Sequence, residues 1–110
     1  MLNRILFLCV LLLPLSSFAG GVYVGQFQPF FNSGTLYLIP IAADISNKPV
    51  CANRVYMRLP DAVGSPEFNA KFSIILSSWM AKKDLRITGT GGCTSEGDEV
   101  VASILMQYST

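Results

Sequence analysis

Apolar and polar residues alternate in short runs after position 20, and this pattern predicts a series of strands with one helix among them. Five segments have the period-two pattern or the short apolar run that favours a strand: residues 21–27, 35–41, 54–59, 85–88 and 100–108. Two of them predict which side chains face the core: Val55, Met57 and Leu59 in the third segment, and Val100, Ala102, Ile104 and Met106 in the fifth.

Glycine, asparagine and proline residues predict where the strands break. Asn32-Ser33-Gly34 is typical of a turn between the first two strands, and residues 28–31 are expected to lie outside both. Pro40 has no amide hydrogen to donate, so it is expected at an edge or at the end of the second strand. The glycine-rich segment 89–92 favours a bulge or a tight bend before Cys93.

The helix is predicted over residues 66–82. Ser65 is a favourable N-cap, and Pro66 suits the first helical position. One apolar stripe follows from the spacing of Phe68, Phe72, Ile75, Leu76 and Trp79. This aromatic stripe is interpreted as a plug for the end of a barrel or sheet, with a ligand platform as the alternative.

The order of these elements predicts a mainly β fold with one helix, β-β-β-α-β-β. A single helix between the third and fourth of five strands is the arrangement of an OB-fold-like, five-stranded Greek-key barrel. An open antiparallel sheet with one packed helix is the alternative, because it predicts the same pattern of burial.

Residues 1–19 have the pattern of a cleavable signal peptide. Arg4 precedes an apolar run, and Ser17-Phe18-Ala19 offers small residues at a cleavage site. The run is too short for a bilayer span, and no second one follows, so no membrane anchor is expected. The prediction is a secreted or periplasmic protein with a single domain over residues 20–110.

Cysteine usage agrees with export. Cys9 lies within the signal peptide, which leaves Cys51 and Cys93 as an even pair in an oxidising compartment. We predict a disulfide between them, worth about 4 kcal/mol on the chain-entropy model. A reactive or metal-binding thiol is the alternative.

Charge and composition exclude several functions. The chain has no histidine, which removes the commonest general base and metal ligand, so no enzyme, metal site or cofactor is expected. The formal net charge is +1, and a nearly neutral chain has no general attraction for nucleic acid. The acidic cluster of Glu96, Asp98 and Glu99 is interpreted as a solvated turn, with a weak calcium site as the alternative.

The segment from the helix to Cys93 carries a resemblance to a known group. Its pattern is Phe72-x-x-Ile75-Leu76-x-x-Trp79-Met80-Ala81-x-Lys83-x-Leu85-x-Ile87-x-Gly89-x-Gly91-x-Cys93. It is similar to small exported bacterial OB-fold-like proteins, mostly of unknown function, and the last strand and the early cysteine match them too. These proteins distantly resemble the B subunits of pentameric toxins of the subtilase cytotoxin type. The resemblance implies glycan binding and ring formation, and it transfers no contact residues.

The leading functional hypothesis is therefore a secreted, non-enzymatic binding or assembly module. Its expected partners are a cell-surface glycan or another exported protein, with a homo-oligomer as one form of assembly. The candidate binding residues are Arg54, Tyr56 and Arg58, which share the outward face of the third strand. A solvated strand face without a ligand is the favoured interpretation of these three residues. The alternatives are a periplasmic protein-binding or inhibitor module and a single-stranded nucleic-acid-binding domain.

Overall fold

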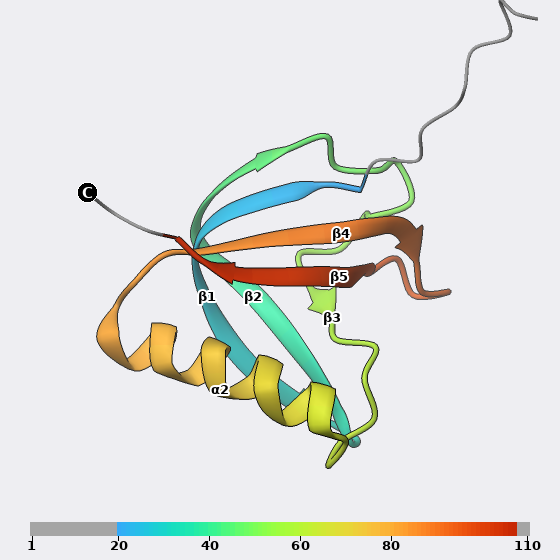
Figure 1. Ribbon diagram of the computed structural model, residues 1–110. Coiled ribbons are helices and arrows are strands. Elements are labelled where there is room, and N and C mark those ends of the chain that lie inside the picture. The colour runs from blue at the N-terminus through green and yellow to red at the C-terminus, as the bar shows by residue number, and fades with distance from the viewer. Residues whose placement is uncertain (1–19, 108–110) are drawn as a thin grey trace, which may run out of the picture.

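The computed structural model describes residues 20–107, and the predicted signal peptide lies outside them. Five strands and one helix follow one another within these residues (Figure 1): β1 (Val22–Asn32), β2 (Thr35–Ser46), β3 (Met57–Arg58), α2 (Pro66–Ala81), β4 (Leu85–Cys93) and β5 (Glu99–Met106). The prediction of a mainly β fold with one helix is confirmed.

The five strands form one closed sheet in the order β1-β2-β3-β5-β4, and β1 pairs with β4 to complete the ring. All neighbours are antiparallel except β3 and β5, which run parallel and meet at Met57 and Glu99. The helix packs against β1 and β5 and lies across the sheet (Figure 1). The core lies between the sheet and α2, and its buried apolar residues are Tyr23, Phe27, Leu36, Leu38, Met57, Leu59, Phe68, Ile75, Leu85, Ile87 and Val101.

The hairpin of β1 and β2 is longer than the sequence predicts, because both strands continue through their proline residues. The predicted turn is present: Ser33 and Gly34 both have positive φ, 52° and 78°, as in the tight turns that match strand twist. Pro40 lies inside β2 and not at its end, but it has the expected edge position: it pairs with Phe27 of β1, and pairing with β3 stops after Leu38. The strand accommodates it with a bulge, since the register shifts between Gln26 and Phe27, opposite Pro40.

The third strand is much shorter than predicted. Only Met57 and Arg58 pair, with β2 on one side and β5 on the other. Met57 and Leu59 are buried as predicted, but Val55 is 64% exposed, because the chain before β3 is a loop without strand pairing. The predicted inward position of Val55 is therefore wrong.

The predicted inward face of β5 is also partly wrong. Val101 is buried, whereas Ala102 and Met106 are exposed and Val100 is half-buried. The cause is a bulge in β5 itself: Thr88 pairs with Ser103 and Gly89 pairs with Val101, which leaves Ala102 as an extra residue. The extra residue moves the inward face by one position, and only Ile104 packs against the core as predicted. A second register shift, between Gly89 and Cys93, lies in the glycine-rich segment of β4 where the sequence predicts a bulge or a bend.

The helix begins as predicted and ends one residue earlier. The Ser65 hydroxyl accepts a hydrogen bond from the Phe68 amide at 3.1 Å, and Lys82 takes a left-handed conformation just after the last turn. Phe68 and Ile75 are buried, but Leu76 and Trp79 are 38% and 37% exposed. The buried stripe is narrower than the apolar stripe of the sequence.

Candidate binding pocket

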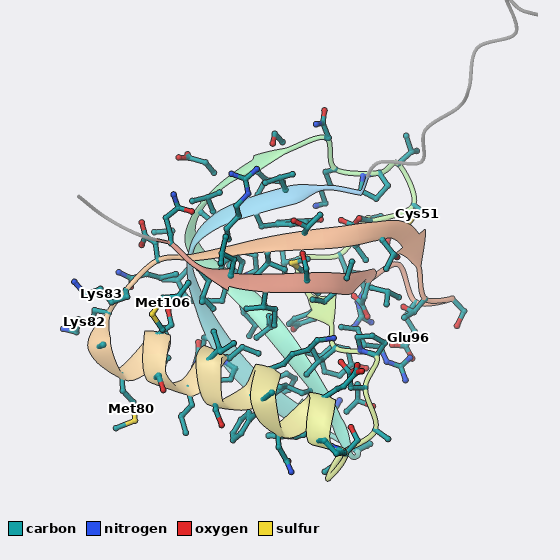
Figure 2. The ribbon with its side chains drawn as sticks, in the orientation of Figure 1. Cys51, Met80, Lys82, Lys83, Glu96 and Met106 are labelled. Carbon is teal, nitrogen blue, oxygen red and sulfur yellow. A yellow bond between two sulfur atoms is a disulfide. The ribbon has the colours of Figure 1, made fainter. Side chains whose placement is uncertain are left out.

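A pocket of about 580 Å³ lies outside the closed sheet, where the β1–β2 turn, β3 with its preceding loop and the β4–β5 turn meet. The polar residues Asn32, Ser33 and Thr35 form one side. The remaining wall is aromatic and charged, and its side chains are Phe30, Tyr37, Tyr56, Arg54, Arg58 and Glu96. Glu96 marks this region in Figure 2.

Three aromatic rings form one wall of the pocket. The centroids of Phe30 and Tyr56 are 6.1 Å apart with nearly parallel planes, and the centroids of Tyr37 and Tyr56 are 5.9 Å apart, edge to face. Strand pairing explains the cluster: Phe30 lies opposite Tyr37 in the hairpin, and Tyr37 lies opposite Arg58 in β3. These spacings are typical of mutually stabilising aromatic pairs.

Arg54 is held in place by charge and by an aromatic face. Its guanidinium carbon lies 5.0 Å from the centroid of the Tyr56 ring. Its Nε donates to Asp98 Oδ1 at 2.9 Å, and its terminal nitrogen lies 3.7 Å from Glu96 Oε2. Because the Asp98 side chain is fully buried, Arg54 can move little without leaving an unpaired carboxylate behind.

The loop before β3 is fixed to the β4–β5 turn. The amides of Asn53 and Arg54 both donate to the Gly97 carbonyl, at 3.1 and 3.2 Å. Gly97 has a φ of 97°, and a Cβ there would lie 1.9 Å from Asn53 Oδ1, so this close approach requires glycine. The loop that carries Arg54 is therefore held in place by contacts within the protein itself.

Arg58 offers hydrogen-bond donors to the pocket. Its side chain is half-buried, and its Nε has no hydrogen-bond partner among residues 20–107. That atom is closed off from solvent, so it is not the donor that a ligand would meet. Arg58 contributes to the wall a guanidinium group whose charge makes no ion pair among residues 20–107.

The structure brings all three sequence-derived candidates, Arg54, Tyr56 and Arg58, to this one pocket. The sequence pattern does not single out Phe30 and Tyr37, because it predicts a break between strands at residues 28–31. The signal was present in the sequence: an aromatic residue on each side of a predicted turn, at positions that pair if both strands are extended.

The predicted disulfide is present. Cys51 and Cys93 are bonded, with their Cα atoms 5.9 Å apart, and the bond joins the loop before β3 to the last residue of β4. Figure 2 shows Cys51 beside the end of β4. The bond fits an extracellular or periplasmic protein.

The acidic cluster is not the solvated turn that the sequence predicted. Asp98 and Glu99 are both fully buried, and only Glu96 is exposed. Among residues 20–107, no group of three acidic or cysteine side chains is arranged to hold a metal ion. Asp98 holds Arg54, and Glu99 belongs to a second polar centre, between β1, β4 and β5.

That second centre links Glu99 to β1. Tyr23 is buried and donates its hydroxyl to Glu99 Oε1 at 2.5 Å. Burial, the hydrogen bond to Glu99 and the negative charge of that carboxylate together raise the pKa of Tyr23 above its ordinary value of 10.0.

The raised pKa of Tyr23 predicts a loss of stability at alkaline pH. Above pH 10.0 the unfolded chain releases the phenol proton while the folded chain retains it, so the free energy of unfolding should fall as the pH rises from there. Tyr23→Phe should remove this part of the pH dependence in urea unfolding between pH 9 and 11. Tyr37→Phe, which leaves the Tyr23–Glu99 bond intact, should retain it. An unchanged slope in Tyr23→Phe would contradict the assignment.

Comparisons with known proteins add no match: no family model, curated protein or solved structure corresponds to this chain. Within residues 20–107 we find no helix that is long and apolar enough to cross a membrane.

Proposed function

We propose that this chain is an exported, non-enzymatic binding module with an OB-fold-like barrel, and that its aromatic pocket binds a glycan. The strand order β1-β2-β3-β5-β4 and the helix between β3 and β4 support the finer fold assignment. The candidate signal peptide and the Cys51–Cys93 bond support export.

The observation that carries the proposal is the position of the pocket on the barrel. OB-folds bind oligosaccharides and oligonucleotides on the face of strands 2 and 3, between the loops that join strands 1 and 2 and strands 4 and 5. The pocket of this chain has the corresponding position. Ser33 comes from the first loop and Glu96 from the second, Asn32 and Thr35 flank the first loop, and Tyr37 and Arg58 come from β2 and β3.

The chemistry of the wall fits a sugar. Flat, partly exposed rings of Phe30 and Tyr56 offer apolar faces to the C–H side of a pyranose, and the Arg58 guanidinium offers donors to its oxygens. The positive charge of the other arginine, Arg54, is already neutralised by Asp98 and Glu96. This balance favours a neutral or weakly acidic ligand over a polyphosphate backbone, which needs an uncompensated positive groove.

Two neighbouring phenylalanines provide a matched test of glycan binding. Phe30 lines the pocket, whereas Phe31 packs against Phe68 and Phe72 of α2. Phe30→Ala should weaken binding to the glycans selected on an array by at least about tenfold, as for an aromatic hot spot. Phe31→Ala should leave that affinity unchanged, with folding of both variants checked by thermal unfolding.

Two outcomes would count against this proposal. The first is an array without any bound glycan for the oxidised, folded chain, and the second is an equal loss of affinity in both variants. Salt-dependent binding to a single-stranded oligonucleotide would instead favour the nucleic-acid-binding alternative.

A protein-binding module is the second candidate function, favoured by one observation. A second, smaller cavity of about 220 Å³ shares Arg54 and Tyr56 with the pocket. Its lining includes Ile41, Ile45 and Val55, and all three side chains are exposed. After Leu38, β2 still pairs with β1 along one edge, whereas its pairing with β3 along the other edge has stopped. An unpaired strand edge beside apolar side chains fits strand addition by another exported protein.

Self-assembly is part of the proposal, and exposed apolar side chains support it. Trp79 and Met80 on α2, and Leu105 and Met106 on β5, are at least 37% exposed. Figure 2 shows Met80 pointing away from the fold. Light scattering that gives the mass of a monomer at micromolar concentration would count against a ring.

A further inference from the structure

Glu99 is a fully buried carboxylate without a cation. Its Oε2 accepts from the amides of Gly21, at 2.9 Å, and Gly91, at 3.1 Å, and its Oε1 accepts from the Tyr23 hydroxyl. None of the ion pairs among residues 20–107 includes it. A carboxylate has about four acceptor positions, so one remains open beside these three donors.

Glycines make the space around this carboxylate. A Cβ on Gly89 would lie 2.1 Å from Glu99 Cδ, and one on Gly21 would lie 2.8 Å from Oε1. Gly20 is buried in the same place: a Cβ there would lie 1.8 Å from the Gly89 carbonyl oxygen and 2.7 Å from the Gly91 nitrogen. The backbone of residues 20 and 21 thus lies against β4 and beside the Glu99 side chain, which contacts both segments.

This position of residues 20 and 21 brings the start of the predicted mature chain close to Glu99. Consecutive backbone nitrogens are separated by at most about 3.6 Å. Since the Gly21 nitrogen is 2.9 Å from Glu99 Oε2, the Gly20 nitrogen lies at most about 6.5 Å from that oxygen. This upper bound is close to the range of about 4–6 Å within which an opposite charge favours the charged form of a group.

We propose that Glu99 binds the α-ammonium group of Gly20, which cleavage after Ala19 releases, and that this ion pair completes the junction of β1 with β4 only in the processed chain. The proposal rests on the predicted cleavage site and not on glycan binding. In the precursor, Gly20 has a neutral amide, so the buried Glu99 charge has no cation and the folded state is less stable. Cleavage creates a charge of about +1 at neutral pH, because an α-amino group ordinarily titrates near pH 7.7–8.0.

The proposed stabilisation depends on the position of the free amino group and not only on the removal of the signal peptide. One extra residue before Gly20 would move the ammonium group by about 3.5 Å and would restore the neutral amide. Correct processing therefore adds a specific interaction, and folding of the precursor before export is correspondingly disfavoured.

A thermodynamic cycle tests the proposal. Oxidised chains that begin at Gly20 are prepared with a free amino group, with an acetylated one, and with Ala19 retained, each in the wild type, in Glu99→Gln and in Glu96→Gln. Urea unfolding at pH 6 gives the folding equilibrium constant. Acetylation or the extra residue should lower that constant at least tenfold in the wild type and in Glu96→Gln, but less than twofold in Glu99→Gln.

An equal effect in all three backgrounds, or no effect in the wild type, would overturn the proposal. Should Glu99→Gln not fold, the reactivity of the wild-type amine gives an independent answer. Acylation of the Gly20 amine should be at least tenfold slower in the folded chain than in urea, while Lys82 and Lys83, both exposed, should change little. An unprotected amine, or an exported chain that does not begin at Gly20, would also overturn the ion pair.

Discussion

The double substitution Cys51→Ser and Cys93→Ser is expected to lower the free energy of unfolding by about 4 kcal/mol. The two cysteines are 42 residues apart in the sequence, so their bond removes a large amount of chain entropy from the unfolded state. In the folded state the bond joins the loop before β3 to the end of β4. A loss of this size is comparable to the whole stability of a marginal small domain.

Urea unfolding of the purified chains measures this loss. Reduction of the wild-type chain with dithiothreitol should reproduce it, and the same reductant should have no further effect on the double variant. A loss below 1 kcal/mol would show that the unfolded chain is already compact around this loop, or that other contacts hold the two segments together.

Ile75→Ala is expected to destabilise the fold by about 3 kcal/mol, and Leu76→Ala by less than 1 kcal/mol. The two residues are adjacent on α2 and similar in size, but Ile75 is fully buried in the core, whereas Leu76 is 38% exposed. Removal of the Ile75 side chain leaves a cavity between the helix and the closed sheet, while truncation of Leu76 removes a side chain that water already reaches.

This pair of variants also tests the assembly proposed above. If Leu76→Ala costs as much as Ile75→Ala at high protein concentration but not at low concentration, a second copy covers that face of α2. Equal costs at all concentrations would mean that α2 is rotated relative to the arrangement described here.

The tertiary structure also explains why part of the pocket could be predicted and part could not. Arg54, Tyr56 and Arg58 alternate along one short segment, so their common face follows from the period of an extended chain alone. Phe30 and Tyr37 join them only because β1 continues through Pro29 and pairs with β2, and β2 in turn pairs with β3. No local pattern reports such long-range pairing.

Glu99 provides the clearest example of a prediction reversed by the fold. In the sequence, Glu96, Asp98 and Glu99 look like one polar turn. The structure divides them between an exposed position, a buried partner for Arg54 and a buried acceptor for the amides of Gly21 and Gly91. Buried carboxylates need distant donors, and the sequence does not indicate which backbone amides will be brought near.

The sequence by itself determined the type of the elements, the start of the helix at Ser65, the turn at Ser33-Gly34 and the pairing of the two cysteines that follow residue 19. These features depend on local backbone preferences and on the chemistry of single side chains. Only the tertiary structure decided the inward face of β5, the length of β3 and the walls of the pocket. They depend on strand register, which a bulge shifts by one residue, and on the close approach of segments that lie far apart in the chain.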